Sequence, residues 1–180
     1  MADQGLAHLS DNFFWIALVV YAVAMVGYFA SLAYRWRWTG SVATVIAALG
    51  AVSHATSIIT RGLAAGRVPW GNMYEYSSLV GLLLVTWFLI FVQGRNGMRQ
   101  IGGFAMALGV LLLAAARLLY APAGPLVPAL NTYWIKIHVV AAISASSIFS
   151  LSFIFTVLYL VKDRVERRGA LFGGSTVGAA

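Results

Sequence analysis

The sequence contains no cysteine and very few charged residues. Without cysteine, this chain of 180 residues cannot form disulfides, a thiolate metal site or a reactive thiol. Charged residues make up only 9% of the chain, whereas 61% of it is hydrophobic. Because a soluble domain of this size needs a largely charged surface, the composition favours an integral membrane protein.

Acidic residues are especially scarce, which leaves a formal net charge of +7. The lysines and arginines stand in short clusters between apolar runs, as membrane topology requires, and do not form the basic face of a nucleic-acid-binding protein. Nucleic acid is therefore not an expected partner. The chain also lacks a phosphate-binding loop, a nucleophile triad, zinc-ligand spacing and paired carboxylates, so we expect no hydrolysis or phosphoryl transfer by this chain alone.

Five apolar segments are long enough to cross a lipid bilayer, since a core of about 30 Å needs about 20 helical residues. The predicted spans are 13–34, 41–60, 76–92, 101–119 and 137–161. They predict an all-α fold, a polytopic membrane helix bundle that forms a single domain over residues 1–168. The glycine-rich segment 169–180 is expected to be a flexible tail or a truncation point. The first span is too long for the core of a signal peptide, so we expect it to be retained.

Lysine and arginine are distributed unequally between the two sides of these spans. One side has eight: Arg35, Arg37, Arg95, Arg99, Lys162, Arg164, Arg167 and Arg168. The other side has four: Arg61, Arg67, Arg117 and Lys136. Because the more basic side of a membrane protein usually faces the cytoplasm, the N-terminus is predicted outside and the C-terminus inside.

Two histidines are candidates for chemistry. His138 is predicted at the outer start of the last span, close to Trp134, where a neutral imidazole can ligate haem iron. Composition alone favours the other interpretation, an interfacial histidine that hydrogen-bonds a loop carbonyl. His54 falls inside the second span, where an ionisable side chain is costly and usually faces a cavity or a neighbouring helix. A functional role and a structural hydrogen bond are equally consistent with that position.

Glu75 is the only acidic residue between Asp11 and Asp163, and it ends the predicted outer loop RGLAAGRVPWGNMYE. A carboxylate is favoured near a helix N-terminus by the unpaired backbone N–H groups, so Glu75 could simply cap the third span. Alternatively, it pairs with Arg61 or Arg67 and fixes the shape of the loop.

Two segments resemble the CcsA/ResC family of cytochrome c biogenesis proteins. The first is PWGNMYE followed by SSLVGLLL, and the second is LNTYWIKIHVVAAISAS. The similarity covers roughly residues 13–168, and actinobacterial members, often labelled CcsB, look closest. In that family the histidine of the second segment is an external haem ligand, and it corresponds here to His138.

The resemblance implies a role in the System II pathway at the bacterial cytoplasmic (inner) membrane. There, a complex with a ResB-type partner carries haem b as a transported substrate to the outer face and attaches it to apocytochrome c. The cysteines that accept haem belong to the apocytochrome, which suits a chain without any. The chain would be a subunit of a haem lyase and is not expected to be active alone.

The resemblance also implies a set of site residues. His138 would be the axial ligand of the haem iron; the resemblance carries no role over to His54, which is a candidate for a haem contact only from its position inside the second span. The remaining candidates would shape the outer loop, where arginines could also meet haem propionates: Arg61, Arg67, Trp70, Asn72, Tyr74, Glu75 and Trp134.

The chain departs from the family pattern in lacking the tryptophan-rich segment WGxxWxWD, the second external histidine and the intramembrane histidine. It therefore resembles the N-terminal part of a longer protein, or a truncated copy. Two other functions stay open. The chain could be a membrane-anchor cytochrome b subunit that uses His54 and His138 as paired haem ligands, or a non-catalytic scaffold of the synthase complex.

Overall fold

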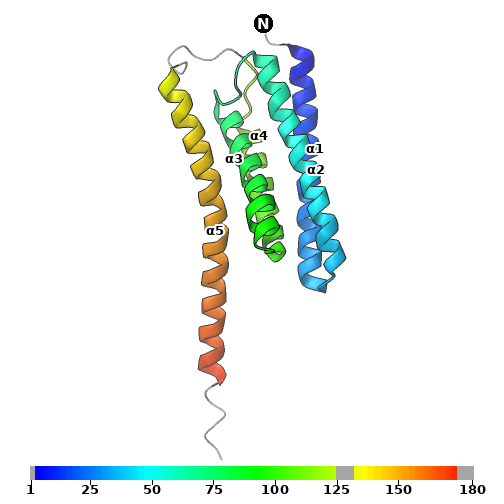
Figure 1. Cartoon of the computed structure of the whole chain (residues 1–180), viewed down its shortest axis with the longest axis vertical. Coiled ribbons are helices and arrows are strands. Elements are labelled where there is room, and N and C mark those ends of the chain that lie inside the picture. The colour runs from blue at the N-terminus through cyan, green and yellow to red at the C-terminus, as the bar shows by residue number, and fades with distance from the viewer. Residues whose placement is uncertain (1–2, 125–131, 174–180) are drawn as a thin grey trace, which may run out of the picture.

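The computed structural model describes residues 3–124 and 132–173, and these ranges are helical without any strand (Figure 1). Five of the helices are long and apolar enough to cross a membrane, which confirms the predicted all-α membrane bundle. In chain order the elements are α1 (Gln4–Tyr34), α2 (Arg37–Ala65), α3 (Met73–Trp87), the π-helix η1 (Phe88–Arg95), the 3₁₀ turn η2 (Arg99–Ile101), α4 (Gly102–Leu118) and α5 (Tyr133–Gly173).

The first and last helices extend well beyond the predicted spans. The carboxylate of Asp3 caps α1 by accepting hydrogen bonds from the backbone N–H groups of Gly5 and Leu6, at 2.9 and 3.2 Å. At the other end of the chain, α5 continues to Gly173 and so enters the segment 169–180, of which residues 174–180 lie outside the described ranges. The thickness of the membrane therefore sets the minimum length of the apolar segment. The ends of the helix are set separately, by capping residues such as Asp3.

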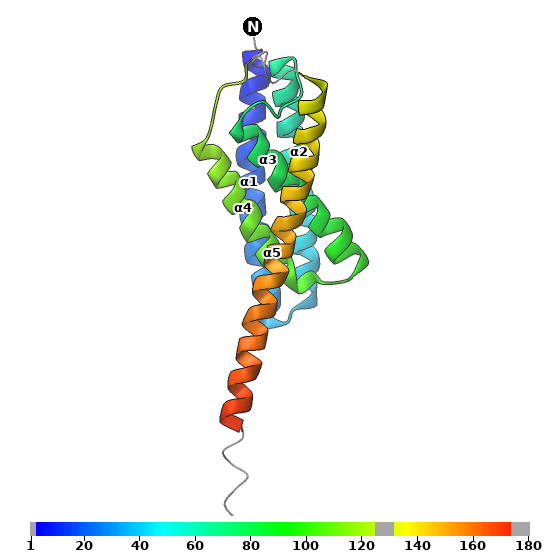
Figure 2. The ribbon, with the colours of Figure 1, turned by 90° about the vertical axis from the view of Figure 1, so that its left-hand side faces the viewer.

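The helices form an antiparallel bundle with one outlying member. α1 packs most extensively against α2, while α4 packs against both α1 and α3. α5 packs mainly on α3 and reaches beyond the other helices at the lower end (Figures 1 and 2). We call the upper end, which holds Gln4, the loop 66–72 and Tyr133, the N-terminal end of the bundle. The opposite end, which holds Arg35, Arg95 and Arg99, is the basic end.

The contact between α1 and α2 follows a heptad-like spacing. The buried side chains of α1 alternate three and four residues apart: Phe14, Ala17, Tyr21, Ala24 and Tyr28. This spacing keeps one narrow face of α1 against its neighbour. On α2, Gly50 makes room for Tyr21, since a Cβ atom there would lie 2.7 Å from the tyrosine ring. Small residues thus let the two helices approach closely, as is common in membranes.

Polar side chains join the same two helices near the N-terminal end. Ser10 Oγ donates to the carbonyl of Ser57 at 2.7 Å, and Ser57 Oγ donates back to the carbonyl of Ser10 at 2.8 Å. Because lipid offers no competing hydrogen bonds, such pairs hold transmembrane helices in one register, at about 0.6 kcal/mol each.

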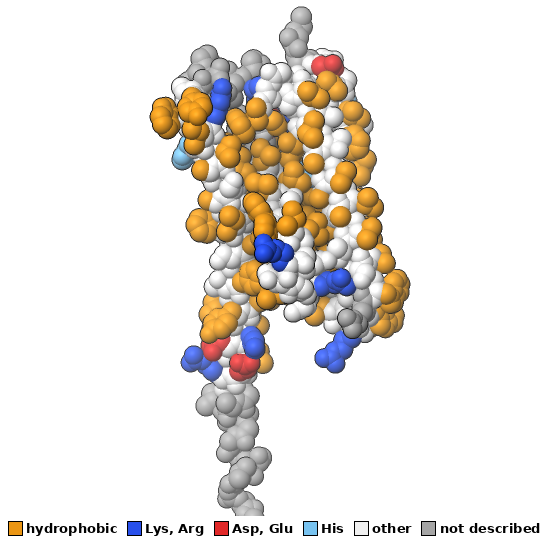
Figure 3. Space-filling model, in the orientation of Figure 1, with side chains coloured by type: hydrophobic (Ala, Val, Ile, Leu, Met, Phe, Trp, Pro, Cys, Tyr) orange, Lys and Arg blue, Asp and Glu red, His pale blue; other side chains and the backbone are white. Residues whose placement is uncertain are grey.

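Apolar side chains face outward over the middle of the bundle, where lipid tails would surround them. On α1, for example, Val19, Val23 and Val26 are all exposed. Figure 3 shows hydrophobic side chains over the centre of one face and charged side chains towards its two ends. The molecule therefore has the surface of a membrane-spanning bundle.

Candidate functional site

The N-terminal end of the bundle contains a cluster of Arg61, Arg67 and Glu75, which we call the Arg–Glu cluster; Arg67 is partly buried and the other two are buried. Arg61 Nε lies 2.9 Å from Glu75 Oε1, and Arg67 Nη1 lies 2.9 Å from Glu75 Oε2. Arg61 and Glu75 are only 3% and 2% exposed. The prediction that Glu75 pairs with an arginine is confirmed, and the carboxylate binds both candidates at once. Charge-assisted contacts of this kind fix geometry as well as charge.

Local sequence explains how the cluster forms. Gly66 ends α2 in the left-handed conformation, with φ +62°, so the chain turns back towards the bundle. Asn72 then caps α3, because its side-chain oxygen accepts from the backbone N–H of Glu75 at 2.9 Å. Glu75 Oε2 in turn accepts from the backbone N–H of Gly71 at 2.8 Å. Of the two predicted roles of Glu75, the structure therefore shows ion pairing, while the helix cap is supplied by Asn72 and the carboxylate binds the backbone of the loop before α3.

The two arginines also tie this loop to the segment that follows α4. Arg61 Nη2 donates to the carbonyl of Ala121, and Arg67 Nε donates to the carbonyl of Gly124 at 2.8 Å. One carboxylate and two guanidinium groups thus hold together α2, α3 and the chain after α4. The arginines counted on the less basic side of the membrane have a structural reason for being there.

Aromatic rings surround the cluster. The guanidinium of Arg61 lies over the ring of Tyr74, 4.5 Å from its centroid, and that of Arg117 lies over Tyr120 at 4.3 Å. Tyr120 also donates to Asp11 on α1 at 3.3 Å. Tyr74 was among the predicted residues, but Asp11, Arg117 and Tyr120 were not. No local pattern could have identified them, because they come from α1 and from the end of α4.

The other predicted loop residue, Trp70, makes a weaker contribution. It is partly buried, and its backbone N–H donates to the carbonyl of Val68 at 3.0 Å, which tightens the turn before α3. Trp70 lies in the loop 66–72, which also contains Arg67 of the Arg–Glu cluster.

His138 and Trp134 lie one turn apart near the start of α5, and both side chains are exposed; Trp134 is 77% exposed. Within the described parts of the chain, the imidazole of His138 forms no hydrogen bond or ion pair. The structural interpretation, a histidine bonded to a loop carbonyl, has no support among these residues. Among the described residues nothing occupies its ring nitrogens, so the imidazole could donate a lone pair to an external metal ion at the N-terminal end.

His54 has a different environment. It is fully buried between α1 and α3, with Nε2 2.9 Å from Ser78 Oγ and Nδ1 3.5 Å from the hydroxyl of Tyr21. Phe14 packs edge-on against the imidazole, with ring centroids 6.3 Å apart. These contacts match the structural interpretation of this residue, an interhelical hydrogen bond within the membrane.

This arrangement defines what the end of the bundle can do chemically. The Arg–Glu cluster carries two positive charges and one negative charge, yet its guanidinium groups are already bound to Glu75 and to backbone carbonyls. The cluster therefore stiffens this surface, and much of the hydrogen-bonding capacity of its guanidinium groups is already used. Among the described residues at this end, the imidazoles of His8 and His138 are both exposed and without a hydrogen bond or ion pair, and that of His138 is flanked by the exposed ring of Trp134.

Comparison with known proteins places these features in one family. Residues 70–173, which include the end of the loop, Glu75 and all of α5, match the family described as cytochrome c assembly protein. Three similar proteins are each named cytochrome c biogenesis protein CcsA.

The CcsA protein of Porphyra purpurea is 30% identical to this chain over 150 residues, covering 78% of this chain and 46% of the relative. That of Trieres chinensis is 27% identical over 172 residues, covering 89% and 52%. That of Synechococcus elongatus is 28% identical over 157 residues, covering 76% and 47%. The chain thus spans about half the length of the curated relatives it matches.

Proposed function

The chain belongs to the cytochrome c assembly protein family, and we propose on this premise that it handles haem during cytochrome c biogenesis. In this proposal His138 ligates the haem iron at the outer membrane surface. The observation that carries it is the exposed imidazole of His138, which has no partner within the described residues and lies inside the matched region. A histidine placed in this way can supply an axial nitrogen ligand without unfolding any part of the bundle.

The Arg–Glu cluster supports that site by fixing its surroundings. It stiffens the loop 66–72 against the chain after α4, so an incoming haem meets a preformed surface at the N-terminal end. Trp134 adds an exposed aromatic ring one turn from His138, which offers apolar area to the face of a porphyrin.

We also propose the setting in which this site works. Haem b is the transported substrate, and apocytochrome c, whose thiols accept it, is the partner on the outer side. A ResB-type protein joins the chain in a haem lyase complex of the bacterial inner membrane. The N-terminal end faces outward and the basic end faces the cytoplasm, as the distribution of Lys and Arg favours.

The test is an optical spectrum of the chain purified in mild detergent after expression with haem available. The wild type is expected to retain haem and show a Soret band, which His138→Ala abolishes. His8→Ala is the matched control, because His8 is also exposed at the N-terminal end and its loss should leave the band unchanged. Equal bands in the wild type and in His138→Ala would contradict the proposal. No band in any protein would favour a scaffold that binds no haem.

The contacts of His54 weigh against the cytochrome b alternative. Bis-histidine ligation needs a free ring nitrogen on each histidine, but both nitrogens of His54 face hydroxyl groups of neighbouring helices. Haem would also have to enter a position that is fully buried by packed side chains. We therefore assign His54 to the interior packing of the bundle.

A further inference from the structure

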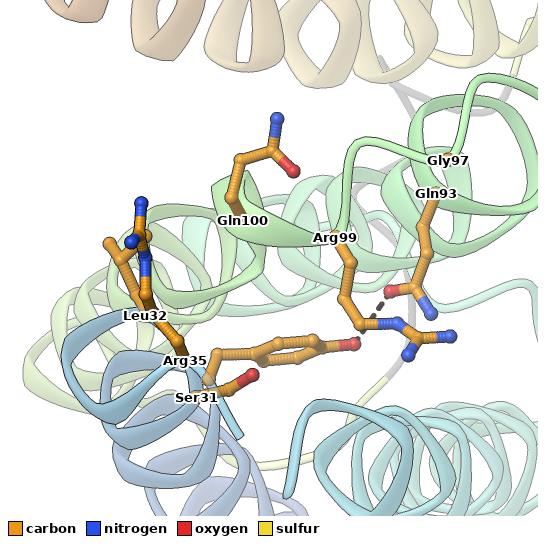
Figure 4. Close-up of a pocket in the computed structure, with 8 residues that line it drawn as sticks. Ser31, Leu32, Arg35, Gln93, Gly97, Arg99 and Gln100 are labelled. Carbon is orange, nitrogen blue, oxygen red and sulfur yellow. Dashed lines mark hydrogen bonds between the residues drawn. The ribbon is translucent and has the colours of Figure 1, made fainter. Parts of the chain in front are cut away.

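A second polar feature lies at the basic end, far from the Arg–Glu cluster along the helices. It is a partly open pocket of about 610 Å³ between the end of α1 and the turn that joins η1 to α4 (Figure 4). Two of its lining residues are arginines, Arg35 and Arg99, and the described residues that line it include no acidic side chain. A pocket lined by positive charge attracts anions.

Arg99 enters the pocket with part of its hydrogen-bonding capacity unused. Its Nη1 donates to Ser41 Oγ at 2.9 Å, but its Nε is buried and has no acceptor in the described parts of the chain. Gly40 makes this placement possible, since a Cβ atom there would lie 2.8 Å from Cδ of Arg99. A buried donor without a partner is costly, and a bound anion would supply the missing acceptor.

Arg35 reaches the same pocket from a backbone conformation that favours glycine. It follows α1 with φ +56°, and it is the only residue other than glycine with positive φ among those described. A glycine would adopt this turn without the crowding that a Cβ atom causes. This uncommon backbone conformation motivates the hypothesis that the side chain of Arg35 is used. Figure 4 shows Arg35 and Ser31 near the end of α1, on the opposite side of the view from Arg99 and Gln93.

The wall opposite Arg35 is held in a defined position. Gln93 Oε1 accepts from the hydroxyl of Tyr28 at 2.7 Å, and Gln93 Nε2 donates to Thr44 Oγ1 at 2.6 Å. Gln93 belongs to the π-helix η1, a distortion of regular helix that often marks functional sites. The side-chain amide of Gln93 thus links η1 to α1 and α2 at one wall of the pocket.

Exposed aromatic rings at this end indicate the depth of the pocket in a membrane. The rings of Tyr34 and Trp36 stack with centroids 5.3 Å apart, and those of Trp36 and Trp38 stack at 6.5 Å. All three are exposed. Rings of this kind concentrate at the level of lipid headgroups.

We propose that this pocket binds the anionic headgroup of a membrane amphiphile through Arg35 and Arg99. Phosphate and carboxylate oxygens both match guanidinium donors, and the exposed side chain of Leu32 on the pocket wall would contact the first part of an apolar tail. Two sources share this chemistry. One is the phosphate of an acidic phospholipid; the other is the propionate pair of haem, which rests on the proposed function.

The experiment is native mass spectrometry of the detergent-purified chain after incubation with equal amounts of phosphatidylglycerol and phosphatidylcholine. The wild type is expected to retain phosphatidylglycerol preferentially. Arg35→Gln and Arg99→Gln should each lower that retention about tenfold, the effect of losing one charge-assisted contact. Arg95→Gln is the matched control, because it removes the same charge at the same end from a residue that does not line the pocket.

Arg35→Gly separates binding from folding. It relieves the positive φ, so the variant should unfold at a temperature no lower than the wild type, yet it should lose the preference for phosphatidylglycerol. A parallel arm titrates haem into the His138→Ala protein, in which the proposed outer ligand is absent. If only haem retention falls about tenfold with Arg35→Gln and Arg99→Gln, the anion is the haem propionate. If neither lipid nor haem retention falls, or if Arg95→Gln lowers them equally, the proposal is overturned.

Discussion

At the scale of single residues, Glu75 forms ion pairs with two arginines at once. It neutralises Arg61, which is buried, and it also binds Arg67 and the backbone of the loop. Removing one partner of a buried ion pair leaves the other charge unpaired in a medium of low polarity, which costs about 3–5 kcal/mol. The shape of the N-terminal end should therefore depend on this one carboxylate.

We predict that Glu75→Gln lowers the free energy of unfolding by about 3 kcal/mol, since the amide cannot offset the charge of Arg61. The measurement is denaturant unfolding of the purified chain in detergent. Glu166→Gln is the control, because the pair of Glu166 with Lys162 is exposed and should change stability by less than about 1 kcal/mol. Similar losses for the two variants would refute the assigned role of Glu75.

His54 gives a second prediction at this scale. We expect His54→Gln to leave the haem Soret band unchanged, because the structure gives His54 hydrogen-bond partners on α1 and α3. Ser78→Ala should instead destabilise the bundle by about 1–3 kcal/mol, since it leaves a buried ring nitrogen without its partner. Optical spectra and unfolding curves check the two variants. Loss of the band in His54→Gln would revive the cytochrome b alternative.

At the scale of elements, close helix contacts depend on glycines placed opposite aromatic rings. Gly102 begins α4 directly against Tyr28 of α1, and a Cβ atom there would lie 2.6 Å from the ring. We predict that Gly102→Ala lowers the free energy of unfolding by about 1–3 kcal/mol, because the ring must move. Gly124→Ala is the control, since no atom of the described residues lies within 4 Å of its added Cβ. Equal unfolding curves for the two variants would show that α1 and α4 do not approach as described.

The five helices were predictable because the bilayer imposes a minimum length on each apolar run. Their ends were less so: α1 begins at Gln4 rather than at residue 13, because Asp3 caps a polar first turn that composition alone assigns to a loop. The pairing of Glu75 with the arginines could be predicted because no other acidic residue lies in the middle of the chain.

Other features depend on tertiary contacts that no local pattern carries. The π-helix η1 aims Gln93 at Tyr28 and Thr44, which lie on two other helices. Likewise, Tyr120 meets Asp11 only because the end of α4 lies beside the start of α1. That His138 has no hydrogen-bond partner among the described residues could not be predicted either, since the sequence around an exposed histidine and around a hydrogen-bonded one can be the same.

At the scale of the whole molecule, the orientation in the membrane stays a prediction from charge distribution. The absence of cysteine makes it testable with single-cysteine variants, because the parent protein has no background labelling. Tyr133→Cys, at the N-terminal end, should react with a membrane-impermeant maleimide in intact cells. Val165→Cys, exposed beyond the basic end, should react only after lysis. The reverse pattern would place the N-terminal end in the cytoplasm and remove His138 from the side where apocytochrome c is expected.

The most direct measurement of the central claim is rescue of the haem site by free imidazole. The account predicts that His138→Gly loses the Soret band of the wild-type chain and that added imidazole restores it, because the small molecule supplies the missing nitrogen ligand. The same treatment should leave the His8→Gly spectrum unchanged. A band that persists in His138→Gly, or one that is lost and not restored by imidazole, would contradict the assignment of His138 as the ligand of the haem iron.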